Sequence, residues 1–422
     1  MSAMFRSLRF FNYRIWFLGA VVSNIGTWMQ RTAQDWLVFD ILTEQDAAAM
    51  GIVMALQLGP QLVMAPWAGL IADRFDRRKV LMVTQLSMAL LGLGLGLMVI
   101  TDVVALWHVY AFALALGVVS SVDAPARQTF VSELVRDDFL PNAVALNSTS
   151  FNLARMVGPA VAGVLTVAVG PGWVFLINAA TFAATIAALL AIRSSELRDL
   201  PRAAKGKGMI REGFRYVRFR PDLVVVMAAI FIIGTFGLNF AIYIAGMARE
   251  EFGGHAGDFG LLSSVMAVGS VLGALLAARR ERPRLRFIFG ASAAFAVACT
   301  AAALAPNAWL FGLFLVPVGV SSLTIMTSAN AYVQTTTDPV MRGRVMALYM
   351  AIFMGGTPLG APFVGLVSNA FGARWGLGVA AISGVVAAVV GLAWAWRAKQ
   401  LRFQFDRMPK RRLRIVYLSE RH

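Results

Sequence analysis

Charged residues interrupt several apolar stretches of this chain, and their side chains could bind protons or ligands. Arg31 and Asp35 are four residues apart, so on a helix they share one face. Arg155 lies in another apolar stretch; if that stretch crosses a membrane, Arg155 is about 21 Å along the helix, deep in hydrocarbon. An arginine there needs a carboxylate, a water-filled cavity or an anionic substrate, whereas a buried carboxylate can load and release protons.

Asp123 and Arg127 form a second pair of charges beside an apolar stretch. We interpret Asp35, Asp123, Arg31 and Arg155 as candidates for proton coupling. Two plainer interpretations remain open. Arg31 and Asp35 would then simply pair at the outer surface, and Asp123 and Arg127 would form an interfacial ion pair that caps a helix.

Gly158, Pro159 and Gly163 follow Arg155 in the same stretch. Proline bends a membrane helix, and glycine lets a neighbouring helix approach closely. The spacing therefore predicts a bent and tightly packed helix, and packing alone is an alternative explanation of these three residues.

A short charged segment, residues 69–79, separates two apolar runs. It begins at Gly69 and contains Asp73, followed by the basic residues Arg74, Arg77 and Arg78. Charges this dense cannot enter hydrocarbon, so the segment predicts a tight loop at a membrane face. Its positive charge indicates the cytoplasmic face.

Residues 69–79 resemble the signature between the second and third helices of major facilitator superfamily transporters, a Gly-x-Leu-x-Asp-Arg-x-Gly-Arg-Arg pattern. Asp76 stands where this pattern has its second Gly, as in the exporter branch that includes the enterobactin and macrolide exporters. Residues 123–128 and 152–163 are also similar to that branch. The second of these segments resembles its Gly-Pro-x-x-Gly-Gly antiporter motif, with Ala162 in place of the first of the last two glycines.

The resemblance implies a conformational switch at the cytoplasmic side. In the resembled fold Asp73 lies beside the eleventh helix, where it would meet the positive end of a helix dipole or an arginine such as Arg127. This contact would hold one state shut and break in the other. The implied switch residues are Gly69, Asp73, Arg74, Arg77, Arg78 and Arg127.

Composition also favours a membrane protein. Of 422 residues, 59% are hydrophobic and only 14% are charged, and the mean hydropathy is +0.70, which is typical of a bundle of membrane helices. Cys299 is the single cysteine and the three histidines are scattered, so no metal site is expected. No Gly-rich nucleotide loop and no catalytic arrangement occurs, so neither ATP nor an enzyme is expected.

Twelve stretches are apolar over the roughly 20 residues that a spanning helix needs. The basic residues fall almost entirely in the alternate connections that become cytoplasmic if the amino terminus is inside. The net charge of +16 is therefore expected to face anionic lipid headgroups, not nucleic acid. The expected spans are 15–39, 49–72, 79–101, 104–126, 142–169, 172–192, 222–246, 258–278, 286–305, 308–329, 343–369 and 375–396.

An internal repeat relates the two parts of the chain. A shift of 202 positions aligns Trp107 with Trp309 and Gly163 with Gly365, among other pairs. The same shift places Ile325 opposite Asp123, so this acidic residue has no charged counterpart. The repeat predicts an all-α fold of two pseudo-symmetric six-helix bundles. The expected units are a bundle at 1–192, a cytoplasmic linker at 193–221, a second bundle at 222–396 and a basic cytoplasmic tail at 397–422.

The resembled fold has a central passage lined by helices 1, 4, 7 and 10. Among many Phe and Met, these helices carry scattered polar residues, which suits an amphipathic substrate. The expected substrate-cavity residues are Asn24, Gln30, Gln34, Ser120, Asn239, Tyr243 and Ser322.

The prediction is a twelve-helix exporter of the major facilitator superfamily, driven by a proton gradient without a cofactor. It would be a monomer in a bacterial inner membrane, with both termini cytoplasmic, and would move a small drug-like or siderophore-like molecule outward. The alternatives are a proton-coupled uptake symporter for a sugar or another nutrient, and a membrane receptor or scaffold that does not transport.

Overall fold

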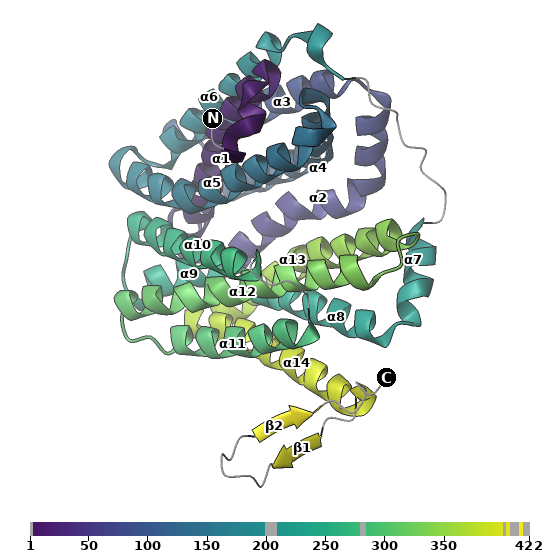
Figure 1. Cartoon of the computed structure of the whole chain (residues 1–422). Helices are drawn as coiled ribbons and strands as arrows, with labels where there is room; N and C mark the ends of the chain where they lie inside the picture. Colours follow the sequence, from purple (N-terminus) through teal and green to yellow (C-terminus); the bar gives the residue numbers. More distant parts are fainter. Residues whose placement is uncertain (1–2, 199–208, 279–283, 400–401, 406–412, 417–422) are drawn as a thin grey trace.

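The computed structural model describes residues 3–198, 209–278, 284–399, 402–405 and 413–416. Its N-terminal half contains six long helices, drawn from purple to teal in the upper part of Figure 1. These are α1 (Phe11–Trp36), α2 (Ala47–Arg74), α3 (Arg77–Ile100), α4 (Leu106–Leu134), α5 (Leu140–Val169) and α6 (Pro171–Ala191). Short helical turns flank them: η1 (Ala3–Arg9), η2 (Leu37–Leu42), η3 (Asp137–Phe139) and η4 (Ser194–Glu196).

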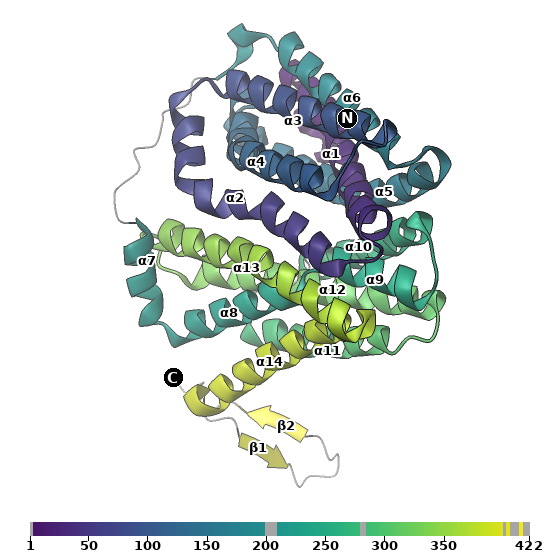
Figure 2. The same cartoon turned by 180° about the vertical axis from the view of Figure 1, so that it is seen from behind.

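The C-terminal half repeats this arrangement below the first half in both views (Figures 1 and 2). Its first span is divided into α8 (Pro221–Ile232), η5 (Ile233–Gly237), α9 (Phe240–Gly246) and η6 (Met247–Glu251). The others are α10 (Ala256–Ala278), α11 (Leu285–Ala303), α12 (Ala308–Thr336), α13 (Arg342–Phe371) and α14 (Ala373–Lys399). Two strands of the tail, β1 (Arg402–Phe405) and β2 (Leu413–Val416), pair antiparallel.

The helices confirm the expected membrane fold. In the described residues, 11 stretches are long and apolar enough to cross a membrane. The polar residues of α1 keep it out of that set, and α1 packs between α5 and α6 as the twelfth span. When the bounds of α4 and α5 are shifted by 202 positions, they coincide with the bounds of α12 and α13. The sequence repeat is therefore also present in the structure.

Four helices join the halves, in two matching pairs. α2 packs along α13, and α5 packs along α10. Small residues allow the close approach: a Cβ added to Gly51 would lie 2.4 Å from the carbonyl oxygen of Ala361, and one added to Gly260 would lie 2.3 Å from that of Pro159. Glycine at such positions lets membrane helices pack backbone to backbone.

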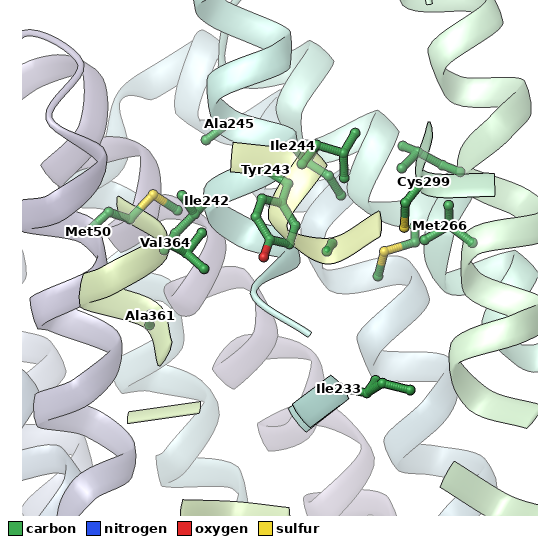
Figure 3. Close-up of a cluster of buried hydrophobic side chains, with 14 of the residues drawn as sticks. Met50, Ile233, Ile242, Tyr243, Ile244, Ala245, Met266, Cys299, Ala361 and Val364 are labelled. Atoms are coloured by element: carbon green, nitrogen blue, oxygen red, sulfur yellow. The ribbon is translucent and has the colours of Figure 1, made fainter. Parts of the chain in front are cut away.

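A buried apolar cluster fills the junction between α2, α9 and α13. Figure 3 shows Met50 beside Ile242, Tyr243 and Val364, all of which are buried. Cys299 lies in the same large core and is buried, as expected for a packing residue. The junction is therefore apolar away from the charged residues described below.

The span expected at 222–246 is interrupted. After η5 the chain leaves the helix at Leu238 and Asn239 before α9 begins. The side chain of Asn239 donates to the carbonyl oxygen of Thr235 at 2.8 Å, and the Tyr243 hydroxyl donates to that of Phe236. These bonds satisfy carbonyl groups that a broken helix leaves open, which is necessary where water is scarce.

The linker between the halves contains α7 (Met209–Arg218) at the edge of the molecule (Figure 1). Glu212 of α7 pairs with Arg344 of α13 at 2.6 Å. After α7, Arg220 binds Asp222 at 2.8 Å, and this hydrogen bond raises the pKa of Arg220 above its ordinary value. The linker is thus attached to the C-terminal half. We call the end of the molecule that holds α7 and the α2–α3 turn the linker end, and the opposite end the far end.

Candidate functional site

A cavity of about 310 Å³ lies between the two halves. This volume is within the range of small-molecule sites. Its wall comes from α1, α2 and α5 of the first half and from α9, α10, α12 and α13 of the second, with Leu238 from the helix break. The lining residues are Trp28, Arg31, Thr32, Asp35, Met54, Gln57, Leu58, Arg155, Pro159, Leu238, Phe240, Ala241, Ile244, Phe259, Ser263, Met266, Ala267, Ser322, Leu323, Met326, Phe353 and Thr357.

Three charged side chains, Arg31, Asp35 and Arg155, line this cavity, and all three are half-buried. The Arg31 guanidinium lies 5.4 Å from the centre of the Trp28 ring. Arg155 donates a hydrogen bond to the Ser270 hydroxyl at 2.9 Å. The structure thus brings together three of the four residues predicted for proton coupling.

The helical period explains how α1 presents its charges. Trp28, Arg31, Thr32 and Asp35 follow the i, i+3, i+4, i+7 spacing of one helix face, and all four line the cavity. Within the described residues, no ion pair or hydrogen bond joins Arg31 to Asp35. Their charges still interact along the cavity wall. The alternative interpretation, a hydrogen-bonded ion pair between Arg31 and Asp35, is not found in the structure.

Asp123 and Arg127 lie away from the cavity wall. Asp123 is buried between α3 and α4, where it accepts hydrogen bonds from Thr84 at 2.7 Å and Gln85 at 2.8 Å. Arg127 completes this network from one turn along α4, at 3.1 Å. The charges of Asp123 and Arg127 thus neutralise each other inside the first half, as in an ion pair that stabilises the fold.

The basic residues of the α2–α3 turn bind within the first half. Arg77 pairs with Glu133 of α4. Arg78 donates to the carbonyl oxygen of Leu189 at 2.7 Å and to the Ser194 hydroxyl at 2.6 Å, so it satisfies open carbonyl groups at the end of α6. Arg74 is exposed. The switch contacts predicted for Gly69 and Asp73 lie outside what the structure describes, so they stay predictions.

The glycines of α5 mark close packing on two sides. A Cβ added to Gly158 would lie 2.5 Å from Cβ of Trp28 in α1. One added to Gly163 would lie 2.9 Å from the carbonyl oxygen of Ala256 at the start of α10. Pro159, between them, lines the cavity. The antiporter-like segment is therefore part of both the cavity wall and the contact between the halves.

Of the polar residues expected in the substrate cavity, Ser322 is on its wall. The other six lie elsewhere. Asn24 binds Ser150 of α5 at 3.3 Å, and Gln30 binds Asn178 of α6. Asn239 and Tyr243 hold the helix break, Gln34 is buried, and Ser120 is half-buried.

Sequence reasoning missed several polar residues of the wall: Thr32, Gln57, Ser263 and Thr357. The spacing of Thr32 from Arg31 and Asp35 was a usable signal, since it shares their helix face. Gln57 is one of two amides, with Gln61, in the otherwise apolar middle of α2, and an intramembrane polar residue of this kind often marks a site.

Polar contacts close the molecule at its far end. Arg249 of η6 binds Asp40 of η2 at 2.6 Å. Asn369 of α13 donates to Asp46 at 2.6 Å and accepts from the backbone of Ala47 at 2.8 Å, at the start of α2. In the described ranges, the hydrogen bonds and ion pairs between the halves lie at this end or beside the cavity. The described residues contain no group of His, Cys, Asp and Glu suited to a metal ion.

The comparisons with known proteins agree with this architecture. A family model described as "Transmembrane secretion effector" matches residues 2–418. The staphyloferrin A transporter of Staphylococcus aureus (strain NCTC 8325 / PS 47) is 22% identical over 85% of this chain and 90% of its own. The enterobactin exporter EntS of Escherichia coli O1:K1 / APEC is 26% identical over 75% of this chain and 76% of its own.

Solved structures show the same fold at low identity. A bacterial homologue of the human lysosomal transporter Spinster, in an inward-facing and occupied conformation, is 15% identical with a TM-score of 0.72, over 93% of this chain and 97% of its own. The nucleoside transporter NupG is 14% identical with a TM-score of 0.70, over 90% of this chain and 98% of its own. With two six-helix halves around a central cavity and a family match over nearly its whole length, the chain belongs to the transmembrane secretion effector family of major facilitator superfamily transporters.

Proposed function

We propose that this transporter exports a small amphipathic molecule across a bacterial inner membrane in exchange for protons. The observation that carries the proposal is a central cavity with a titratable carboxylate, Asp35, in its wall. No residue of the described chain hydrogen-bonds to that carboxylate. Relatives named as an enterobactin exporter and a staphyloferrin A transporter support a substrate of siderophore size.

The distribution of charge supports a cytoplasmic linker end and cytoplasmic termini. Among the described residues, Arg74, Lys79, Arg136 and Arg220 lie at the linker end. Cytoplasmic loops of membrane proteins carry such an excess of Lys and Arg. With this orientation, the contacts of Asp40, Asp46 and Asn369 would close the outer side, which supports an inward-facing state.

Alternating access then requires the outer contacts to break and the cytoplasmic side to close. The Asp40–Arg249 pair and the Asn369 cap on α2 would be released in the outward-facing state. We propose that Gly69, Asp73 and Arg74 form contacts at the cytoplasmic side in that state. Arg77 and Arg78 attach α3 to α4 and α6. Arg127 supports Asp123 within α4, so these three helices would move as one rigid body.

The proton would be carried by Asp35. A carboxylate in the wall of a cavity that opens to each side in turn can bind a proton outside and release it inside. Asp123 accepts hydrogen bonds from three side chains. It therefore helps to hold α3 and α4 together and does not face the cavity. The proton gradient supplies the energy without a cofactor, and one copy of the chain contains the whole cavity, so a monomer is sufficient.

The test begins with an export and susceptibility screen of overproducing cells against deleted cells, which identifies a transported compound. The purified chain is then placed in proteoliposomes loaded with that compound. An inward proton gradient should accelerate its efflux, and Asp35→Asn should lose this acceleration while exchange of labelled for unlabelled compound continues. Asp102→Asn, an exposed carboxylate in the α3–α4 turn, is the matched control and should behave as the wild type.

Three outcomes would contradict the proposal. Uptake accelerated by an inward proton gradient would identify a symporter. Efflux that stays proton-dependent in Asp35→Asn would remove Asp35 from the coupling. Failure to move any compound found in the screen, under any gradient, would favour a receptor or scaffold.

A further inference from the structure

We propose that the central cavity selects an anionic amphipathic molecule and holds its negative group between Arg31 and Arg155. The proposal rests on the proposed function only in taking this cavity as the substrate site. It concerns the charge of the substrate and is independent of the direction of transport.

The charge balance of the cavity is the first argument. Its lining contains two guanidinium groups, Arg31 and Arg155, and one carboxylate, Asp35. The remaining lining residues are uncharged, so the empty site has an excess of one positive charge when Asp35 is ionised. In surroundings that contain little water, such an excess attracts an anion and repels a cation more strongly than it would in solution.

The partners of the arginines are the second argument. Elsewhere in the described helices, Arg77, Arg127 and Arg249 each pair with a carboxylate at 4 Å or less. Arg155 instead has a neutral partner, the Ser270 hydroxyl, and Arg31 lies over the Trp28 ring. A guanidinium in the membrane interior is costly without a counter-charge, so these two are available to bind a ligand that supplies one.

A buried amide donor in the same wall is the third and independent argument. Gln57 is only 8% exposed and lines the cavity. Its Nε2 has no hydrogen-bond partner among the described residues. A buried donor without an acceptor is unfavourable, and an acceptor oxygen of the ligand would satisfy it. The three side chains together offer donors that a carboxylate or sulfonate satisfies.

The rest of the wall fits an aromatic or aliphatic body. Phe240, Phe259 and Phe353 line the cavity with Met54 and Met326. Aromatic side chains bury large apolar surfaces, and methionine adapts to irregular shapes. The ligand class is therefore an organic anion that carries an apolar body, in contrast to a sugar or an inorganic anion.

A pair of matched probes tests the charge. Anilinonaphthalene sulfonate carries a sulfonate, and phenylnaphthylamine has the same aromatic system without it. Binding of each to the purified full-length chain in a neutral detergent is measured by fluorescence. Micelles of the same detergent without protein give the background for each probe. We expect the wild type to bind the sulfonate at least about tenfold more tightly than the uncharged probe, because hydrogen bonds to charged groups are stronger than those between neutral groups.

Single substitutions test the residues. Arg155→Gln and Arg31→Gln should each weaken sulfonate binding roughly tenfold or more, and leave binding of the uncharged probe nearly unchanged. Arg155→Lys should recover part of the loss because it keeps the charge. Asp35→Asn should strengthen sulfonate binding and leave binding of the uncharged probe nearly unchanged, whereas a misfolded variant with exposed apolar surface would bind both probes more strongly. Arg14→Gln, at an exposed arginine near the start of α1, should bind both probes as the wild type does.

Equal binding of the two probes by the wild type would overturn the proposal, as would unchanged sulfonate binding in Arg155→Gln. Tighter binding of a cationic dye such as ethidium than of the sulfonate would also overturn it. None of these binding results would decide whether the protein exports its substrate in exchange for protons. Conversely, a failure of proton-driven efflux with normal sulfonate binding would reject the proposed function and keep the anion site.

Discussion

Intramembrane charges in this protein fall into two environments. Asp123 and Arg127 are matched by close partners inside the first half. Arg31, Asp35 and Arg155 face the cavity and have no carboxylate–guanidinium pair among the described residues. The first environment holds helices together, whereas the second leaves charge available for a proton or a ligand. Burial alone does not distinguish them, because all five residues are at least half-buried.

The structural network around Asp123 gives a prediction about stability. Asp123→Ala leaves the Arg127 guanidinium without its carboxylate and removes the acceptor of Thr84 and Gln85. Removing one partner of a buried ion pair costs about 3–5 kcal/mol, so the free energy of unfolding should fall by about that amount. Unfolding of the purified protein in mixed micelles by sodium dodecyl sulfate measures it.

The double variant Asp123→Asn/Arg127→Gln is the control for this prediction. It removes both charges together, so it should be more stable than Asp123→Ala. Equal stability of Asp123→Ala and the wild type would show that the network contributes little to the fold.

At the scale of elements, the helix pairs α2–α13 and α5–α10 decide which side of the cavity is closed. They are images of each other under the shift of 202 positions that relates the halves. Both pairs use glycine to bring backbones into contact near the far end, as at Gly51, Gly163 and Gly365. The far end is therefore closed by packing as well as by the Asp40–Arg249 pair.

A larger residue in this contact should open the far end. Gly51→Leu places a side chain where a Cβ already lies 2.4 Å from the carbonyl oxygen of Ala361. A disulfide engineered between Asp46→Cys and Asn369→Cys reports closure, since these side chains hydrogen-bond in the structure. Gly51→Leu should lose most of this crosslink because α2 and α13 separate.

Gly59 of the same helix provides the matched control, because nothing lies within 4 Å of its Cβ position. Gly59→Leu should therefore keep the crosslink. An unchanged crosslink in Gly51→Leu would show that the packing at Gly51 does not hold the far end closed.

At the scale of the whole molecule, the charge of the cavity links transport to the membrane potential. An organic monoanion neutralises the site, so the loaded site carries no net charge and the empty site carries one positive charge. Moving one elementary charge across a membrane is worth about 2.3 kcal/mol per 100 mV. In a cell that is negative inside, the potential favours the return of the empty, positively charged site to the inner side, whereas it does not affect the outward step of the neutral loaded site.

This predicts that the membrane potential accelerates export of an anion. Proteoliposomes loaded with anilinonaphthalene sulfonate and given a negative-inside potassium diffusion potential with valinomycin should release it severalfold faster than liposomes without a potential. Phenylnaphthylamine should show no such effect, and liposomes without protein provide the leak rate. A release rate that does not depend on the potential would contradict the charge assignment.

Much of the fold follows from the sequence alone. The length of the apolar stretches, the basic connections and the shift of 202 positions predict twelve helices in two related bundles, because hydrocarbon imposes the same demand on every span. Sequence also finds the charges that interrupt these stretches, such as Asp35 and Arg155, because a charge in an apolar run stands out wherever it is placed.

The tertiary structure decided which polar residues face the cavity and which face a neighbouring helix. Gln30 and Asp35 both lie in α1, yet Gln30 binds Asn178 of α6 while Asp35 lines the cavity. The helical period places residues on faces, but it does not say which face meets which helix. Hydrogen-bond partners more than 100 positions apart in the sequence, such as Arg155 and Ser270, depend on how the halves pack. The site therefore exists only in the assembled bundle, where the halves bring their polar groups to one cavity.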